Sequence, residues 1–163
     1  MKIVIRKFER GDIPEAAAIW NSVVRDAAAF PQDTELDELE AGDFFAGQSF
    51  TGVAEDTDTG EIVGLYILHP NNVGRCGHIC NASYAVKKDK RGLHVGEALV
   101  RHSLDMGAEC GFRILQFNAV TASNTGAQAL YKKLGFTCVG KVPEGYRRQD
   151  GTYDDILIYI KRL

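Results

Sequence analysis

The stretch KKDKRGLHVGEAL, residues 87–99, combines four basic side chains with two glycines at the start of a helical pattern. A β-strand pattern ends just before it, so a loop between a strand and a helix is predicted here. Such a loop directs unpaired backbone N–H groups and the positive end of the helix dipole toward one point. With Lys87, Lys88, Lys90 and Arg91 beside them, these groups predict an anion site, and a phosphate or pyrophosphate is the expected ligand. The alternative is an ordinary βα turn with surface lysines, because short turns often contain glycine.

Two common phosphate-binding motifs are absent from the sequence. There is no GxxxxGK[ST], and no GxGxxG with an acidic partner downstream, which excludes a nucleoside-triphosphate loop and a dinucleotide fingerprint. Nucleic acid is not an expected partner either. The 163 residues carry a net charge of −3, whereas surfaces that follow a phosphate backbone are usually basic.

Cys76, His78 and Cys80 alternate along a predicted strand, and this spacing raises the question of a zinc site. On a strand that rises ~3.3 Å per residue, Cys76 and Cys80 would lie about 13 Å apart. Two bonds of roughly 2.3 Å to one ion cannot bridge that distance. We therefore expect small buried residues and no metal.

The elements that must position the loop begin with a strand in KIVIRKF and a helix that continues to about Arg25. Asp12 and Glu15 form a capping-box signature for this helix. A second helix, capped by Thr34, is expected over residues 35–47. Its many acidic side chains are interpreted as a solvated face, and a funnel for a cationic substrate is the alternative.

The remaining pattern alternates strands and helices on both sides of the basic loop. SFTGVAE and EIVGLYILH are expected to form an antiparallel hairpin around the turn DTDTG. HICNASYAV and RILQFNAV are predicted strands on either side of the helix EALVRHSLDMGAECG, and NTGAQALYKKLG is a second helix that ends at Gly135. FTCVGKV and DDILIYI complete the chain as an antiparallel pair, with PEGYRRQDGTY as the connection. No run of about 20 apolar residues is present, so no membrane partner is expected.

Two motifs together resemble a known family. RGLHVGEAL resembles the acyl-coenzyme A pyrophosphate loop of the GCN5-related N-acetyltransferases (GNAT family), written Q/R-x-x-G-x-G/A, with Arg91 and Gly96 at its ends. NTGAQALYKKLGF, which begins some 28 residues after Gly96, resembles the next motif of that family, N-x-x-A-x-x-L-Y-x-x-x-G-F. The matching positions are Asn124, Ala127, Leu130, Tyr131, Gly135 and Phe136.

The resemblance implies an α/β (α+β) fold with a central mixed, mostly antiparallel sheet of about seven strands and helices on both faces. It implies one acetyltransferase domain over residues 1–163, with acetyl-CoA as cosubstrate and no metal. No leader pattern or CxxC pair accompanies the four cysteines, so a reducing cytoplasm is the expected location. Pairing into a homodimer is left open.

One position departs from the family pattern, because His94 stands where the middle glycine is usual. Its backbone N–H can still donate a hydrogen bond, and histidine is one of the residues that adopt unusual dihedral angles more readily. The anion site is therefore expected to persist. The added β-carbon brings into question how closely the loop approaches the pyrophosphate.

The resemblance also implies which residues bind the coenzyme. The end of the strand before the loop, at Tyr84, Ala85 and Val86, would bind the pantetheine arm through its backbone, with a local bulge that opens the site. Asn124 is expected to cap its helix, to bind the coenzyme arm, or to do both. The residues expected at the pyrophosphate are Arg91, Gly92, Leu93, His94, Val95, Gly96 and Glu97.

Tyr131 is the candidate general acid, because the matching tyrosine of the family lies near the coenzyme sulfur. Its ordinary pKa of about 10 exceeds the roughly 8.5 of a thiol, so a proton is available for the departing thiolate. The alternative is a packed ring on an apolar helix stripe. No general base can be read from the sequence: the options are a water relay through Asn81, Ser83 or His78, or an amine that arrives partly neutral.

The acceptor is predicted to be the amine of a small molecule or an amino-acid-like compound. GRCGHICNASYAV and QFNAVTASNTGAQALYKKLGF are similar to a branch of the family that acetylates proline analogues such as azetidine-2-carboxylate. In that branch asparagines serve the substrate, and Asn81 and Asn118 are the matching positions; an asparagine amide both donates and accepts. Tyr146 is expected in the last hairpin loop, either in the acceptor pocket or as a surface aromatic. A protein or peptide acceptor and a non-catalytic acyl-CoA sensor are the other two hypotheses.

Overall fold

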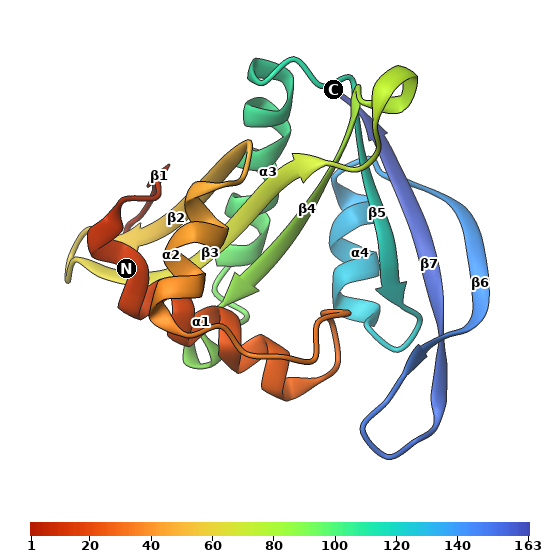
Figure 1. Cartoon of the computed structure of the whole chain (residues 1–163), viewed down its shortest axis with the longest axis horizontal. Helices are drawn as coiled ribbons and strands as arrows, with labels where there is room; N and C mark the ends of the chain where they lie inside the picture. Colours follow the sequence, from red (N-terminus) through yellow and green to blue (C-terminus); the bar gives the residue numbers. More distant parts are fainter.

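The computed structural model describes residues 1–163 and contains one seven-stranded sheet with four α-helices (Figure 1). The strands are β1 (Ile3–Lys7), β2 (Phe50–Asp56), β3 (Glu61–Pro70), β4 (Ile79–Val86), β5 (Ile114–Thr121), β6 (Thr137–Arg147) and β7 (Tyr153–Arg162). The helices are α1 (Ile13–Asp26), α2 (Glu38–Ala46), α3 (Val95–Glu109) and α4 (Thr125–Lys133). Three short 3₁₀ turns are η1 (Arg10–Asp12), η2 (Gly74–Cys76) and η3 (Lys88–Lys90).

The strand order in the sheet is β1-β2-β3-β4-β5-β7-β6, and every neighbouring pair is antiparallel except β4 and β5. A parallel pair needs a crossover connection, and α3 supplies it. The predicted fold class, a mixed and mostly antiparallel sheet of about seven strands, is confirmed.

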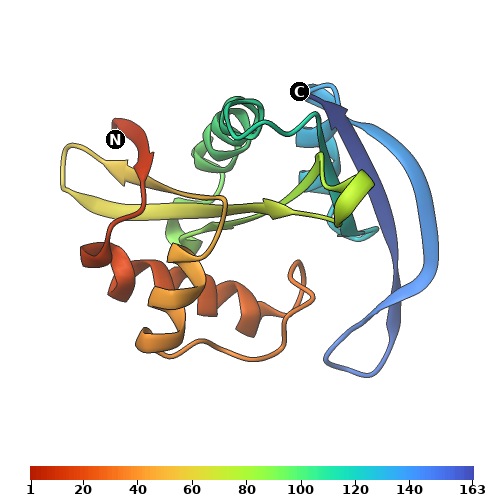
Figure 2. The same ribbon diagram turned by 45° about the horizontal axis from the view of Figure 1, so that its top comes forward.

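Helices cover both faces of the sheet (Figure 2). One core forms where α1 and α2 pack on the first face, and it is centred on the buried Trp20 and Phe45. The other core forms under α3 and α4 on the second face, where Leu99, Leu115 and Phe117 are buried. Both helical layers are amphipathic, so each buries one apolar stripe against strands whose own side chains alternate between the faces.

The two halves of the sheet separate between β4 and β5. These strands are paired only at Ile79–Ile114 and Cys80–Leu115, near the start of each strand. Beyond that point they diverge, as Figure 1 shows, and the remainder of β4 is hydrogen-bonded to β3 alone. The divergence leaves one edge of β4 unpaired beside the loop that follows it.

The capping-box prediction for α1 is wrong, although the helix itself is present. Asp12 makes no side-chain cap; it forms a bidentate ion pair with Arg6, with both N–O distances 2.8 Å, and accepts from the Glu9 amide. Glu15 accepts from the Ile62 amide of β3 at 3.0 Å. Asp12 and Glu15 therefore bond to partners outside the helix and not to its first amides.

The predicted cap of the second helix is also wrong. Asp37 is the N-cap, and its carboxylate accepts from the Glu40 amide at 2.8 Å while the Glu40 carboxylate accepts from the Asp37 amide. The Thr34 hydroxyl contacts only Asp33. The helix begins at Glu38 because this reciprocal box satisfies two of its free amides.

The last hairpin has a shorter loop than predicted, because β6 continues to Arg147. Its pairing with β7 is interrupted between Val142 and Tyr146, where Glu144 has φ +54°. Tyr146 therefore lies on a strand, opposite Asp154, and not in the loop.

Cys76, His78 and Cys80 do not share a strand face. Cys76 is exposed in η2, His78 precedes β4, and only Cys80 is buried. The expectation that Cys76 is buried is thus wrong. No cluster of His, Cys, Asp or Glu is arranged to hold a metal ion, and none of the helices has the length and apolar character to span a membrane.

Candidate active site

The glycine-containing loop opens α3 with free backbone donors. Ala98 donates the first helical hydrogen bond, to the His94 carbonyl, so the amides of Val95, Gly96 and Glu97 have no helical acceptor. His94 has φ +62°, the left-handed conformation that a glycine would adopt without strain. Its side chain is 84% exposed, so the β-carbon points to solvent and the loop keeps its course.

All four basic residues of the junction have acidic partners. Arg91 Nη2 donates to Asp26 Oδ2 at 2.8 Å, and Lys88 Nζ lies 3.6 Å from Asp26 Oδ1. Lys87 forms an ion pair with Glu61, and Lys90 Nζ lies 3.6 Å from Glu61 Oε2. The positive charge is therefore gathered beside the loop but is partly neutralised.

A cavity of about 590 Å³ lies between this loop, the end of α1 and the start of α4. Lys90, Arg91, Gly92 and Gly96 supply its basic, glycine-rich wall. The cavity thus combines two basic side chains with the free amide of Gly96, the kinds of group that bind a pyrophosphate. Leu93, His94, Val95 and Glu97 do not line it, so of the residues predicted at the pyrophosphate only Arg91, Gly92 and Gly96 reach this cavity.

The unpaired edge of β4 runs along the opening between the two halves of the sheet. The Lys87 amide donates to Val63 of β3, so by strand alternation the amides and carbonyls of Tyr84 and Val86 face away from β3, toward the opening. The Ala85 backbone faces β3, and its side chain is buried in the first core. The prediction of a backbone contact from Ala85 is thus not supported by its orientation.

The expected bulge in β4 is absent. The β3–β4 register runs without a shift from Pro70–Cys80 to Gly64–Val86. The opening arises because β4 and β5 diverge, which exposes two free backbone positions without a distortion of the strand.

A second cavity, of about 310 Å³, occupies the opening between β4 and β5. It adjoins the first, since both are lined by Ala29, Tyr84, Gly96, Asn124 and Ala127. Eleven of its 18 lining residues are hydrophobic, and none is Asp, Glu, His, Lys or Arg. A group that enters this cavity is therefore surrounded by apolar side chains, amides and hydroxyls.

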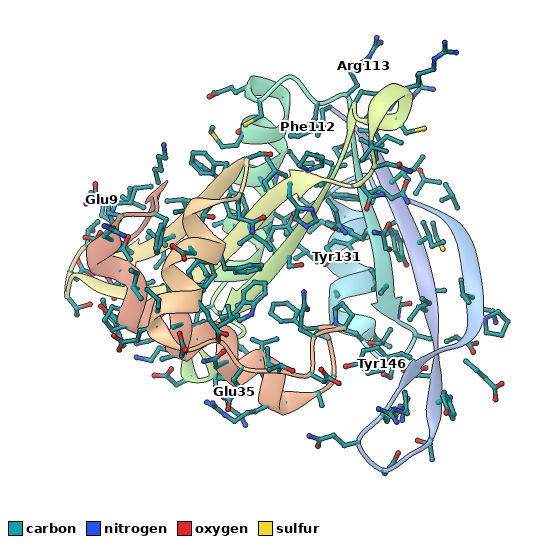
Figure 3. The ribbon with its side chains drawn as sticks, in the orientation of Figure 1. Glu9, Glu35, Phe112, Arg113, Tyr131 and Tyr146 are labelled. Carbon is teal, nitrogen blue, oxygen red and sulfur yellow. The ribbon has the colours of Figure 1, made fainter.

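Tyr131 lines the second cavity from α4, and Figure 3 shows it beside the space between β4 and β5. Its ring packs on Phe117 with the ring centroids 4.4 Å apart, and on Phe136 and Tyr159 at 5.4 and 5.7 Å. Burial, with a smaller contribution from Tyr159, raises the pKa of Tyr131. The phenol therefore keeps its proton at neutral pH. A packed ring and a candidate acid, the two alternatives for Tyr131, are thus compatible with each other.

Asn124 is the N-cap of α4, as predicted. Its Oδ1 accepts from the Ala127 amide at 3.2 Å, and the residue lines both cavities. The capping bond uses the oxygen and leaves the Nδ2 group available as a donor at the point where the cavities meet.

The structure brings Asn81 and Asn118 to opposite sides of the second cavity, from β4 and β5. Asn118 Nδ2 donates to Asn71 Oδ1 at 2.6 Å, and Asn118 Oδ1 accepts from Gln116 at 3.0 Å. This chain of amides fixes the orientation of the Asn118 side chain. Of the polar groups suggested for a water relay, Asn81 and Ser83 line the cavity, whereas His78 does not.

Tyr146 does not line the second cavity. It lies at the end of β6 beside a third cavity of about 300 Å³, and its hydroxyl donates to the Phe30 carbonyl at 2.9 Å (Figure 3). Phe30 itself lines the second cavity. Tyr146 therefore supports the wall and is not part of it.

Sequence reasoning missed the segment that closes the opening, residues 27–31, here called the strap. It leaves the end of α1 and crosses toward the start of α4 (Figure 1), and it contributes Ala29, Phe30 and Pro31 to the second cavity. The Thr121 hydroxyl donates to the Ala28 carbonyl at 3.1 Å and holds the strap to β5. No sequence motif marks these residues. The preceding Asp26 would be an ordinary helix-end residue in the sequence, and only the structure shows its contact with Arg91.

The family of the chain follows from this fold and from its match to the model of the acetyltransferase (GNAT) family over residues 16–136. The chain belongs to this family and is an N-acetyltransferase. Among curated relatives, N-acetyltransferase aca1 of Schizosaccharomyces pombe is 31% identical over 146 residues, which cover 80% of this chain and 70% of the relative. The L-methionine sulfoximine/L-methionine sulfone acetyltransferase of Pseudomonas paraeruginosa is 26% identical over 150 residues, with 88% and 86% covered.

Solved structures agree with the fold. A GCN5-related N-acetyltransferase from Kribbella flavida superposes with a TM-score of 0.90 and 32% identity, over 99% of this chain and 98% of that chain. A phosphinothricin acetyltransferase from Sinorhizobium meliloti, solved in complex with acetyl-CoA, gives a TM-score of 0.89 at 20% identity, over 100% and 89% of the two chains.

Proposed function

We propose that this protein transfers the acetyl group of acetyl-CoA to the amine of a small, amino-acid-like acceptor. The observation that carries the proposal is the pair of adjoining cavities: one has a basic, glycine-rich wall with free amides, and the other is a small apolar chamber beside Tyr131. A relative that acetylates L-methionine sulfoximine and a similar structure with bound acetyl-CoA support both halves of the proposal.

The coenzyme would lie along the unpaired edge of β4. Its pyrophosphate would take the amides that open α3 together with Lys90 and Arg91, and its pantetheine arm would pair with the free backbone groups of Tyr84 and Val86. Asn124 Nδ2 would donate to the arm where the cavities meet. The thioester would then reach the second cavity, beside Tyr131.

The reaction proposed is direct attack of a neutral amine on the thioester carbonyl. After attack the nitrogen would lose a proton to water, Tyr131 would give its own proton to the departing thiolate, and the phenolate would be reprotonated from solvent. Because the chamber carries no carboxylate or imidazole, the amine would lose its proton to water before attack. An apolar chamber favours this, since desolvation lowers the pKa of a bound ammonium group.

The acceptor class follows from the size and polarity of the chamber. A volume of about 310 Å³ suits a compact molecule, and the amides of Asn81 and Asn118 offer donors to a carboxylate from two sides. A homodimer and a cytoplasmic location remain expectations.

A panel of amines tests the proposal. Purified protein is incubated with acetyl-CoA and amino acids, amino-acid analogues, polyamines or peptides, while free thiol is measured and products are identified by mass. Amino-acid-like amines should release thiol well above background. If only peptides are acetylated, the acceptor is a peptide and not a small amino-acid-like amine. Tight coenzyme binding without thiol release for any amine would instead indicate a non-catalytic sensor.

A further inference from the structure

Asp26 places a carboxylate inside the cavity assigned to the coenzyme phosphates. It is the last residue of α1 and lines this cavity together with Lys90, Arg91 and Gly92. Its Oδ2 accepts from Arg91 Nη2 at 2.8 Å, and its Oδ1 lies 3.6 Å from Lys88 Nζ. The bond from Arg91 holds the pKa of Asp26 below its ordinary value, so the group is anionic at neutral pH.

A phosphate and this carboxylate compete for the same guanidinium group. Each presents a pair of anionic oxygens that a guanidinium binds through its fork of N–H donors, and two anions side by side repel each other. From this geometry we propose that Asp26 is a counterion that the coenzyme phosphates displace from Arg91. The proposal rests on the proposed function, because it assumes that an acyl coenzyme A occupies the cavity.

The position of Asp26 in the chain gives its displacement a second consequence. Ala27 follows it with φ +48°, and the strap then contributes Ala29, Phe30 and Pro31 to the acceptor wall. The strap is tied to the rest of the fold at two points: Thr121 donates to the Ala28 carbonyl at 3.1 Å, and Tyr146 donates to the Phe30 carbonyl at 2.9 Å. Release of Asp26 therefore removes the constraint on the residue that precedes the strap, while these two bonds remain.

This arrangement couples the two cavities. Bound coenzyme frees Asp26, and the strap that forms one wall of the acceptor chamber adjusts in response. Because such coupling is reciprocal, an acceptor that prefers the adjusted wall also tightens coenzyme binding. The expected behaviour is that donor binding prepares the acceptor chamber.

The test compares coenzyme A binding to the wild-type chain and to Asp26→Asn by calorimetry. The amide keeps the size of the side chain but removes its charge. Coenzyme A should therefore bind about three- to tenfold more tightly, because it has no exposed ion pair to displace and its phosphates meet no charge repulsion. Asp26→Glu, which keeps the charge, should bind within about twofold of wild type. The matched control is Asp89→Asn, because Asp89 lies on the same loop, 4.0 Å from Lys90 Nζ, outside the coenzyme cavity; it should also change binding by less than about twofold.

Trp20 provides a readout of the strap, since it is the only tryptophan and its ring centroid lies 4.4 Å from that of Phe30. Coenzyme A should shift the emission maximum of wild-type Trp20, and free Asp26→Asn should already resemble the liganded wild type. Tighter binding without any emission change would support the counterion and overturn the coupling. Unchanged or weaker binding by a folded Asp26→Asn would overturn the proposal while leaving the proposed function intact, whereas a wild-type chain that binds no coenzyme A would overturn both.

Discussion

Glu97 Oε2 accepts a hydrogen bond from Lys133 Nζ at 2.7 Å, which joins the helix that opens at the glycine-containing loop to the helix that carries Tyr131. The other oxygen of the carboxylate, Oε1, accepts from Arg101 Nη2 at 2.8 Å. Arg101 lies four residues away on the same helix, whereas Lys133 lies on α4. One carboxylate thus connects α3 and α4, the two helices whose relative position the proposed mechanism requires to be kept.

Glu97→Gln should lower the melting temperature at pH 7 by no more than a few degrees, because its partners are exposed. Hydrogen bonds from Lys133 and then Arg101 lower the pKa of Glu97 from 4.5 to about 2. A depressed folded pKa gives stabilisation that is present above pH 4.5 and lost as the pH falls toward 2. The difference between wild type and Glu97→Gln should therefore shrink from pH 5 to pH 2, as measured by thermal melts.

The control for this prediction is a double-mutant cycle with Lys133→Met. If the contact between helices is energetically real, the two substitutions together should destabilise less than the sum of the single changes. Strict additivity at neutral pH would show that the contact contributes nothing to stability.

His94 is predicted to be a strained position that glycine would relieve. A left-handed conformation costs an ordinary residue about 1–2 kcal/mol, and glycine avoids this cost. The unfolded chain is also more flexible with glycine, which offsets roughly 0.5–1 kcal/mol of the stabilisation. His94→Gly should therefore raise the melting temperature by about 1–4 °C. His94→Ala keeps the β-carbon and serves as the control; a rise of equal size in both variants would mean that the side chain, not the backbone, was unfavourable.

Tyr131→Phe separates chemistry from packing at the candidate acid. Phenylalanine preserves the ring that packs on Phe117 and removes only the hydroxyl, so coenzyme affinity should change by less than about threefold. Turnover should fall by about a hundredfold, the scale of a lost general acid. Calorimetry and steady-state kinetics measure the two effects, and equal losses in both would assign Tyr131 a packing role alone.

The pH dependence of acetyl transfer should follow the acceptor and not the protein. Since no Asp, Glu or His lines the acceptor chamber, kcat/KM should rise tenfold per pH unit from about pH 6.5 until it reaches the pKa of the free amine. Acceptors with different amine pKa values should shift the profile accordingly. A plateau that begins near pH 7 for every acceptor would reveal an enzymic base that the chamber does not show.

Local patterns in the sequence predicted the elements of this fold well, because strand alternation and helical periodicity are properties of neighbouring residues. The same is true of the loop at Gly92–Gly96 and of the N-cap at Asn124. Asp12 and Asp26 show where local reasoning ends: each would be a helix-end residue in sequence, and each instead pairs with an arginine from another element. The resemblance to the family likewise implied a bulge that would open the site at β4. The opening arises from the divergence of β4 and β5, which depends on the packing of both halves of the sheet and therefore has no local signal in the sequence.

The measurement that tests the account most directly compares two acetyl donors, acetyl-CoA and S-acetylpantetheine, which lacks the phosphates. Lys90→Ala combined with Arg91→Ala should lower kcat/KM for acetyl-CoA by about 10- to 100-fold, since charge-assisted bonds to phosphate are lost, and should weaken its dependence on salt. The same double variant should use S-acetylpantetheine as well as the wild type does. Equal losses with both donors, or unchanged use of acetyl-CoA, would contradict the assignment of the glycine-containing loop to the coenzyme phosphates.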